Sequence, residues 1–134
     1  MNEIFTVVSK ESEQSFDITE RVREIVGRSG AESGFCHVMA LHSTAAIVVN
    51  ETADPDIGRD VITALGRMVE RRAGWLHDAR DGNAHAHIKA SLLGSSETIP
   101  TEGGELVLGT WQGIWLFEFD GPRERRVSVR FSPG

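Results

Sequence analysis

Residues 105–120 read ELVLGTWQGIWLFEFD, and successive side chains of a strand point to opposite sides of its sheet. One side of such a strand would carry Val107, Gly109, Trp111, Gly113, Trp115, Phe117 and Phe119. The other side would carry Leu106, Leu108, Thr110, Gln112, Ile114, Leu116 and Glu118. Both sides are largely apolar, so both need cover. We expect a long strand over residues 105–119, with helices covering one side and a second copy of the chain covering the other.

Shorter strand patterns lie on either side of this stretch. Apolar and β-branched residues are concentrated in residues 4–8, 14–18, 35–42, 45–51, 97–101 and 124–131. The first two are joined by a polar turn and are expected to form a pair.

Three segments have helical patterns. The first runs from a cap at Asp17 or Thr19 to about Gly30. The second has Asp54 as its cap and extends toward Gly74. Its apolar face is expected to consist of Ile57, Val61, Leu65, Met68 and Val69. A shorter helix over residues 84–93 would be capped by Asn83.

Strands at both ends with helices between them predict an α+β fold, with mixed or antiparallel sheet layers packed against two main helices. The 134 residues fit one compact domain over residues 1–134. The net charge of −6 disfavours a nucleic-acid partner, and no apolar run approaches the roughly 20 residues of a membrane span. The N-terminal residues lack a signal-peptide pattern, and a single cysteine, Cys36, fits a cytoplasmic location.

Residues 77–87, HDARDGNAHAH, contain three of the five histidines and two aspartates. Imidazoles and carboxylates in a polar loop are suited to metal binding and proton transfer. If residues 84–93 are helical, His85 and His87 lie about 200° apart, and only one of them, expected to be His87, faces a site. If the segment were a strand, both would share a face and could bind one metal.

Other candidates lie near the ends of the expected strands. His42 ends residues 35–42, and Glu51 ends residues 45–51, where it is a general base, a metal ligand or a capping carboxylate. Asp78 follows His77 directly, and either orients that histidine or is a solvated loop residue. Arginines over residues 123–130 either bind phosphate or line an edge strand.

Three segments carry a resemblance to a known family. They are HSTAAIVVNETADPDIGRD from His42, HDARDGNAHAHIKASLLGSS from His77 and LGTWQGIWLFEFDGPRERRV from Leu108. Together they cover most of the chain, and on them the sequence resembles the YjbQ-like family, whose named activity is a secondary thiamine-phosphate synthase.

The resemblance implies a compact homotrimer with a cleft between subunits that binds a divalent metal, zinc or magnesium. The metal ligands it suggests are His42, His77 and His87. The catalytic residues it suggests are Glu51, Asp78 and Gln112, with Lys89 and Arg125 steadying phosphates.

The family's activity joins an aminopyrimidine diphosphate to a thiazole phosphate and releases pyrophosphate, so the expected substrate is a small phosphorylated compound. Two alternatives remain open at this point. One is a hydrolase that uses a zinc-bound water on His42, His77 and His87. The other is a non-catalytic trimeric module that binds metal or ligand.

Overall fold

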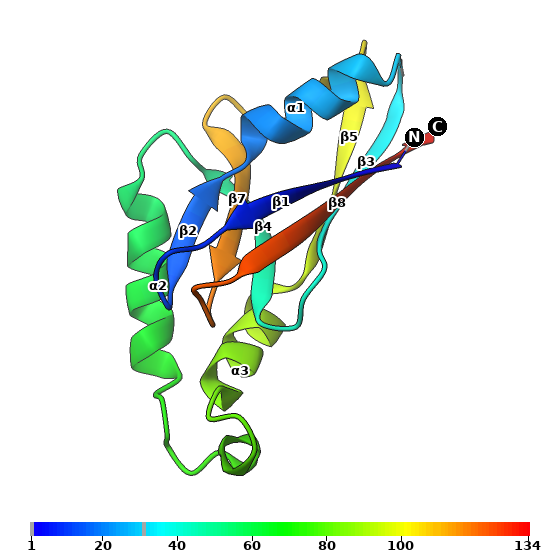
Figure 1. Cartoon of the computed structure of the whole chain (residues 1–134). Coiled ribbons are helices and arrows are strands. Elements are labelled where there is room, and N and C mark those ends of the chain that lie inside the picture. The colour runs from blue at the N-terminus through cyan, green and yellow to red at the C-terminus, as the bar shows by residue number, and fades with distance from the viewer. Residues whose placement is uncertain (1, 31) are drawn as a thin grey trace.

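The computed structural model describes residues 2–30 and 32–134, which form two antiparallel sheets and three α-helices (Figure 1). The larger sheet has the order β1 (Asn2–Val8), β8 (Glu124–Pro133), β3 (Gly34–Ala40), β5 (Ser96–Glu102) and β6 (Glu105–Leu106). The smaller has the order β2 (Gln14–Asp17), β7 (Gln112–Glu118) and β4 (Ala45–Glu51). The α+β expectation is confirmed; the sheets are antiparallel rather than mixed.

The first two strands do not pair with each other, contrary to expectation. Strand β1 pairs with β8, while β2 pairs with β7 in the other sheet. Between them, the side-chain Oε1 of Gln14 accepts hydrogen bonds from the backbone N–H groups of Lys10 and Glu11. The polar turn therefore carries the chain from one sheet to the other instead of closing a hairpin.

Strand β7 is shorter than the expected strand over residues 105–119. It begins at Gln112, and residues 107–111 lie outside it, with Trp111 well exposed. Both of its faces are covered by the same chain. Ile114 and Leu116 pack into the core between the two sheets, whereas Trp115 and Phe117 pack into a second core beneath the helices. A second copy of the chain is not needed to cover this strand.

The uncovered apolar surface lies on the larger sheet instead. Ile4 pairs with Ser128, and Ser128 pairs with Met39, so these residues share a face, and Phe35 joins them by alternation along β3. Ile4, Phe35 and Met39 each remain more than two-fifths exposed. No helix of the described chain packs on this face, which we call the open face.

The helices are α1 (Thr19–Arg28), α2 (Asp56–Met68) and α3 (Ala84–Leu93), which correspond to the two main helices and the shorter helix expected over residues 84–93. Helix α1 buries the expected stripe of Val22, Ile25 and Val26. Helix α2 begins after Asp54, whose Oδ1 accepts the N–H of Asp56 at 2.9 Å.

The end of α2 differs from the expectation. Val69 leaves helical geometry and buries its side chain, so the helix stops well before Gly74. Met68 is 70% exposed and is not part of the apolar face. Among the helices described, none is long and apolar enough to cross a membrane.

Candidate functional site

The histidine-rich segment forms a short 3₁₀ helix, η1 (Leu76–Ala79), followed by a turn and α3. The rings of His77 and His87 meet edge to face, with centroids 4.9 Å apart. His85, two residues earlier on α3, is only 2% exposed and is directed elsewhere. The helical geometry therefore separates His85 from His87, as the spacing argument expected, and pairs His87 with His77.

Asp78 has a structural partner at the start of α3. Its Oδ1 accepts the backbone N–H of Ala84 at 3.0 Å, which satisfies a donor that the helix itself leaves free. The expected cap, Asn83, makes no such bond. Its Nδ2 instead donates to Oδ2 of Asp120 at 2.9 Å, tying the loop before α3 to the segment after β7.

These contacts shape a polar cleft of about 460 Å³. Its lining comes from the segment after β3, the loop before α3, the first turns of α3, and the connection between β7 and β8. The lining residues are His42, Ser43, Asp81, Asn83, His87, Asp120 and Arg123. Residues far apart along the chain therefore place two imidazoles, two carboxylates and a guanidinium around one hollow.

A fully buried ion pair lies behind one wall of the cleft. Arg125 donates from Nε to both carboxylate oxygens of Glu118 at 2.9 Å, and from Nη2 to Oε2 at 2.7 Å. Arg125 Nη2 also donates to Oγ1 of Thr44, which lies 2.9 Å from Nδ1 of His42. Partial burial against the cleft wall, reinforced by the positive charges of Arg125 and Arg123, lowers the pKa of His42.

Arg125 and Lys89, which were expected to bind phosphates, are both buried and form ion pairs within the protein. Arg125 is 2% exposed and is paired as described. Lys89 is 1% exposed; its Nζ pairs with Oε2 of Glu13 at 2.7 Å and lies 5.9 Å from the centroid of the Phe119 ring. Neither residue lines the cleft. Lys89 is four positions after the buried His85, so both fall on the inner side of α3.

Glu51 and Gln112 form a cross-strand pair where β4 ends and β7 begins. His42 precedes the opposite end of β4. A strand of seven residues spans about 20 Å, so one chain does not bring this pair into the cleft. Oε1 of Gln112 accepts the backbone N–H of Gly109 at 2.8 Å, which secures the loop entering β7.

The residues fit the expected divalent ion only in part. His77 Nε2 and Asp78 Oδ2 are buried and have no hydrogen-bond partner in the described chain, although Nε2 of His77 lies 3.5 Å from Oδ2 of Asp81. Atoms that could bind a metal are therefore present beside His87. Within residues 2–30 and 32–134, however, no group of three or more His, Cys, Asp or Glu side chains is placed to hold a metal ion. The three-histidine centre of His42, His77 and His87 is thus not assembled by one chain.

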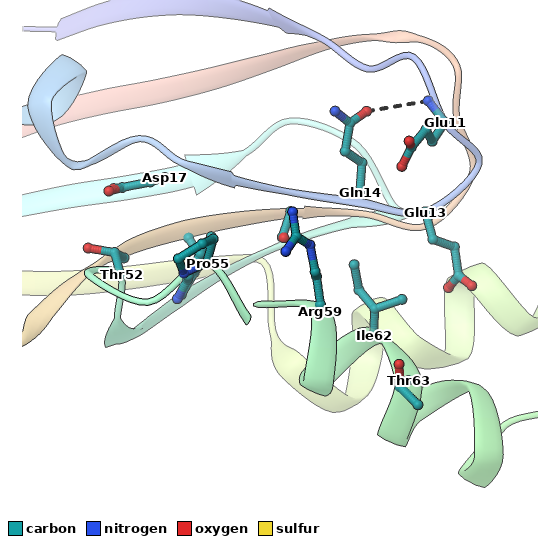
Figure 2. Close-up of a pocket in the computed structure, with 11 residues that line it drawn as sticks. Glu11, Glu13, Gln14, Asp17, Thr52, Pro55, Arg59, Ile62 and Thr63 are labelled. Carbon is teal, nitrogen blue, oxygen red and sulfur yellow. Dashed lines mark hydrogen bonds between the residues drawn. The ribbon is translucent and has the colours of Figure 1, made fainter. Parts of the chain in front are cut away.

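A larger hollow of about 600 Å³ lies between β2 and α2 (Figure 2). Arg59 and Ile62 point from α2 toward β2 across it, whereas the side chain of Gln14 points away from α2 toward Glu11. None of the described residues that line it is a histidine. Nothing in the sequence pattern indicated this hollow, and its size alone does not identify it as the site.

Asp81 and Asp120 were missed by the sequence analysis as cleft residues. Asp81 lies inside the histidine-rich segment, and its Oδ2 is 3.5 Å from Nε2 of His77. The available signal for Asp120 was its place between a long apolar strand and the Gly121-Pro122 turn, since strand ends often carry ligand-binding residues.

Comparisons with known proteins cover the whole described fold. The family described as "UPF0047 protein YjbQ-like" matches residues 3–134. A UPF0047 protein of Archaeoglobus fulgidus is 43% identical over 114 residues, which cover 85% of this chain and 87% of that protein. The UPF0047 protein YugU of Bacillus subtilis is 38% identical over 121 residues, covering 88% and 89%.

Solved structures match this fold over nearly the whole chain. The crystal structure of a YbjQ-like protein of unknown function from Sulfolobus solfataricus P2 has a TM-score of 0.96 and 38% identity, covering 100% of this chain and 97% of that one. A protein of the yjbq/upf0047 family from Clostridium acetobutylicum has a TM-score of 0.92 and 44% identity, with coverage of 97% and 99%.

Proposed function

This chain belongs to the UPF0047 YjbQ-like family, and we propose that it is an enzyme that acts on a small phosphorylated substrate in the His42–His87 cleft. One observation carries the proposal: His42, His87 and Arg123, from three separate segments, line one polar hollow. A guanidinium and imidazole N–H groups are suitable donors to phosphate oxygens. The cleft's size is in the usual range for a small-molecule site.

Thiamine-phosphate formation is the reaction we propose. The thiazole ring nitrogen attacks the methylene carbon of the aminopyrimidine diphosphate, the C–O bond breaks, and pyrophosphate leaves with the bonding electron pair. Donors such as Arg123 and the Ser43 hydroxyl would stabilise the negative charge that develops on the leaving group. The carboxylates of Asp81 and Asp120 would stabilise the positive charge that develops on the pyrimidine methylene.

A divalent ion, zinc or magnesium, would be held by His77 and His87 and would neutralise charge on the diphosphate when bound. Its remaining ligands would come from water, substrate or a neighbouring subunit. The test is the metal content of untagged protein, compared with His77→Ala and His87→Ala. Both variants are expected to lose metal, and unchanged stoichiometry in both would refute this ligand assignment.

Assembly into a homotrimer would complete the site. The open face carries the exposed apolar side chains of Ile4, Phe35 and Met39, which a second copy would remove from water. Glu51 and Gln112 lie about 20 Å along β4 from the cleft of their own chain, so they would act on substrate from a neighbouring subunit. Sedimentation of the wild type and of Phe35→Glu tests the assembly: the wild type should be a trimer, and the variant should dissociate.

The activity test supplies both phosphorylated substrates to purified protein and follows pyrophosphate by phosphorus NMR. His87→Ala, in the cleft, should lose the reaction. Arg59→Ala, in the larger hollow, is the matched control and should retain it. The reverse pattern would move the site to the larger hollow. Phosphate release without condensation would indicate a hydrolase, and binding without turnover would indicate a binding module.

A further inference from the structure

We infer that the buried Glu118–Arg125 pair, acting through Thr44, holds His42 as a hydrogen-bond donor toward the cleft. Glu118 and Thr44 are 0% exposed and Arg125 is 2% exposed, so this chain of polar groups is shielded from solvent until it reaches His42. The inference deepens the proposed function, because it assigns the role of His42 at a phosphate site.

The direction of the hydrogen bonds follows from two groups that only donate, the guanidinium of Arg125 and the backbone N–H of Thr44. Arg125 Nη2 donates to Thr44 Oγ1 at 2.7 Å, so this oxygen accepts there and its own proton is free to be donated. The acceptor within reach is Nδ1 of His42, 2.9 Å away. The backbone N–H of Thr44 also donates to Nδ1, at 3.2 Å. Because Nδ1 receives two donors, it must be unprotonated.

A neutral imidazole with an unprotonated Nδ1 carries its proton on Nε2. His42 is exposed and lines the cleft, and no residue in the described parts of the chain hydrogen-bonds to its Nε2. The group that His42 offers to a ligand is therefore Nε2–H. A phosphate oxygen accepts a hydrogen bond from this group, whereas a metal ion requires a lone pair. His42 thus recognises an anion and is not a metal ligand.

The same buried carboxylate also positions the connection between β7 and β8, which lines the cleft. Oε2 of Glu118 accepts the backbone N–H of Asp120 at 3.1 Å. Oε1 accepts the hydroxyl of Ser9 at 2.7 Å, and that hydroxyl oxygen accepts the backbone N–H of Arg123 at 2.9 Å. One buried group therefore positions backbone at two cleft residues as well as the ring of His42.

The first test reads the tautomer directly. Long-range proton–nitrogen correlation spectra of labelled wild type at pH 8, with His42 assigned by its loss in His42→Gln, should show Nδ1 unprotonated and Nε2 protonated. Thr44→Ser keeps the hydroxyl and should keep this spectrum. Thr44→Val loses the hydroxyl but keeps the backbone N–H donor, so its Nδ1 and Nε2 shifts should move only part of the way toward those of mixed tautomers. A protonated Nδ1 in the wild type, or in Thr44→Ser, would overturn the inference even if Thr44→Val does not fold.

The second test separates a donor from a metal ligand. Inorganic phosphate is titrated into chelator-treated protein by calorimetry. In His42→Gln the amide places an N–H near the Nε2 position, and phosphate affinity should stay within a few-fold of the wild type. In His42→Asn the amide reaches only the Nδ1 position, and affinity should fall about tenfold or more, because a charge-assisted hydrogen bond is lost. Equal losses in the two variants would overturn the donor role.

The two tests distinguish failure of the inference from failure of the proposed function. A wild-type protein that shows the expected tautomer but does not bind phosphate would refute the phosphate site and leave the positioning by Thr44 standing. A protein that binds phosphate but has Nδ1 of His42 protonated would refute the positioning and leave the site standing.

Discussion

Replacing Glu118 by glutamine should remove a large part of the stability of this protein. The substitution keeps the shape of the side chain but leaves the guanidinium of Arg125 buried, at 2% exposure, without its counter-charge. Three hydrogen bonds of 2.7–2.9 Å from Arg125 to the carboxylate would lose their ionic character. Breaking a buried pair in this way costs about 3–5 kcal/mol, a major fraction of the roughly 5–15 kcal/mol that stabilises a typical protein.

Urea unfolding followed by tryptophan fluorescence, at one fixed protein concentration, measures this loss. With a slope of about 2 kcal/mol per molar urea, the midpoint should fall by about 1.5–2.5 M. Glu3→Gln is the matched control, since it removes an exposed 2.7 Å pair with Arg28 and should cost at most about 1 kcal/mol. A loss below about 1 kcal/mol for Glu118→Gln would show that the buried pair does not carry the stability assigned to it.

Three further predictions concern packing, pH and reactivity. Gly113→Ala should lower the free energy of unfolding by about 1–3 kcal/mol, measured by thermal unfolding, because its new methyl group would collide with two threonine side chains. In the control Gly66→Ala, the new methyl group meets nothing within 4 Å, so the change should be neutral or stabilising. Equal effects of the two substitutions would contradict the packing described. Burial lowers the pKa of both His85 and His42, so below their usual value of 6.5 the unfolded chain takes up protons that the native state does not, and the free energy of unfolding should fall as the pH drops from 7.5 toward 5.5. A His85→Gln variant should have a shallower slope over that interval, and an unchanged slope would count against the assignment. Burial raises the pKa of the Cys36 thiol to about 11, so a thiol reagent at pH 8 should modify it far more slowly in native than in urea-unfolded protein, and comparable rates would disprove its enclosure.

Most elements of this fold can be predicted from local sequence patterns, but their partners cannot. Alternating apolar residues identified the strands, and the stripe of Val22, Ile25 and Val26 identified α1. Whether β1 pairs with β2 or with β8 depends on contacts across more than a hundred residues, which local periodicity does not encode. The end of α2 at Met68 was also missed, because the burial of Val69 in extended backbone outweighs its helical spacing.

The site could be predicted in part for a similar reason. The expected helix over residues 84–93 is confirmed and separates His85 from His87, and the structure places His42 and His87 in one cleft. Sequence position alone could not show that Glu51 ends its strand far from that cleft. The burial of Lys89 was open to prediction, since it lies one helical turn after His85 on an alanine-rich side of α3.

Strand β8, which comes last in the sequence, lies between β1 and β3. It therefore pairs directly with β1, which comes first. During synthesis, β1 therefore has no neighbour in its sheet until residues 124–133 have left the ribosome. Such long-range pairing is typical of slow folding. Until then the edge of β1 and the apolar side chains behind it are open to other chains, so the nascent protein should depend on chaperones far more than its small size would suggest.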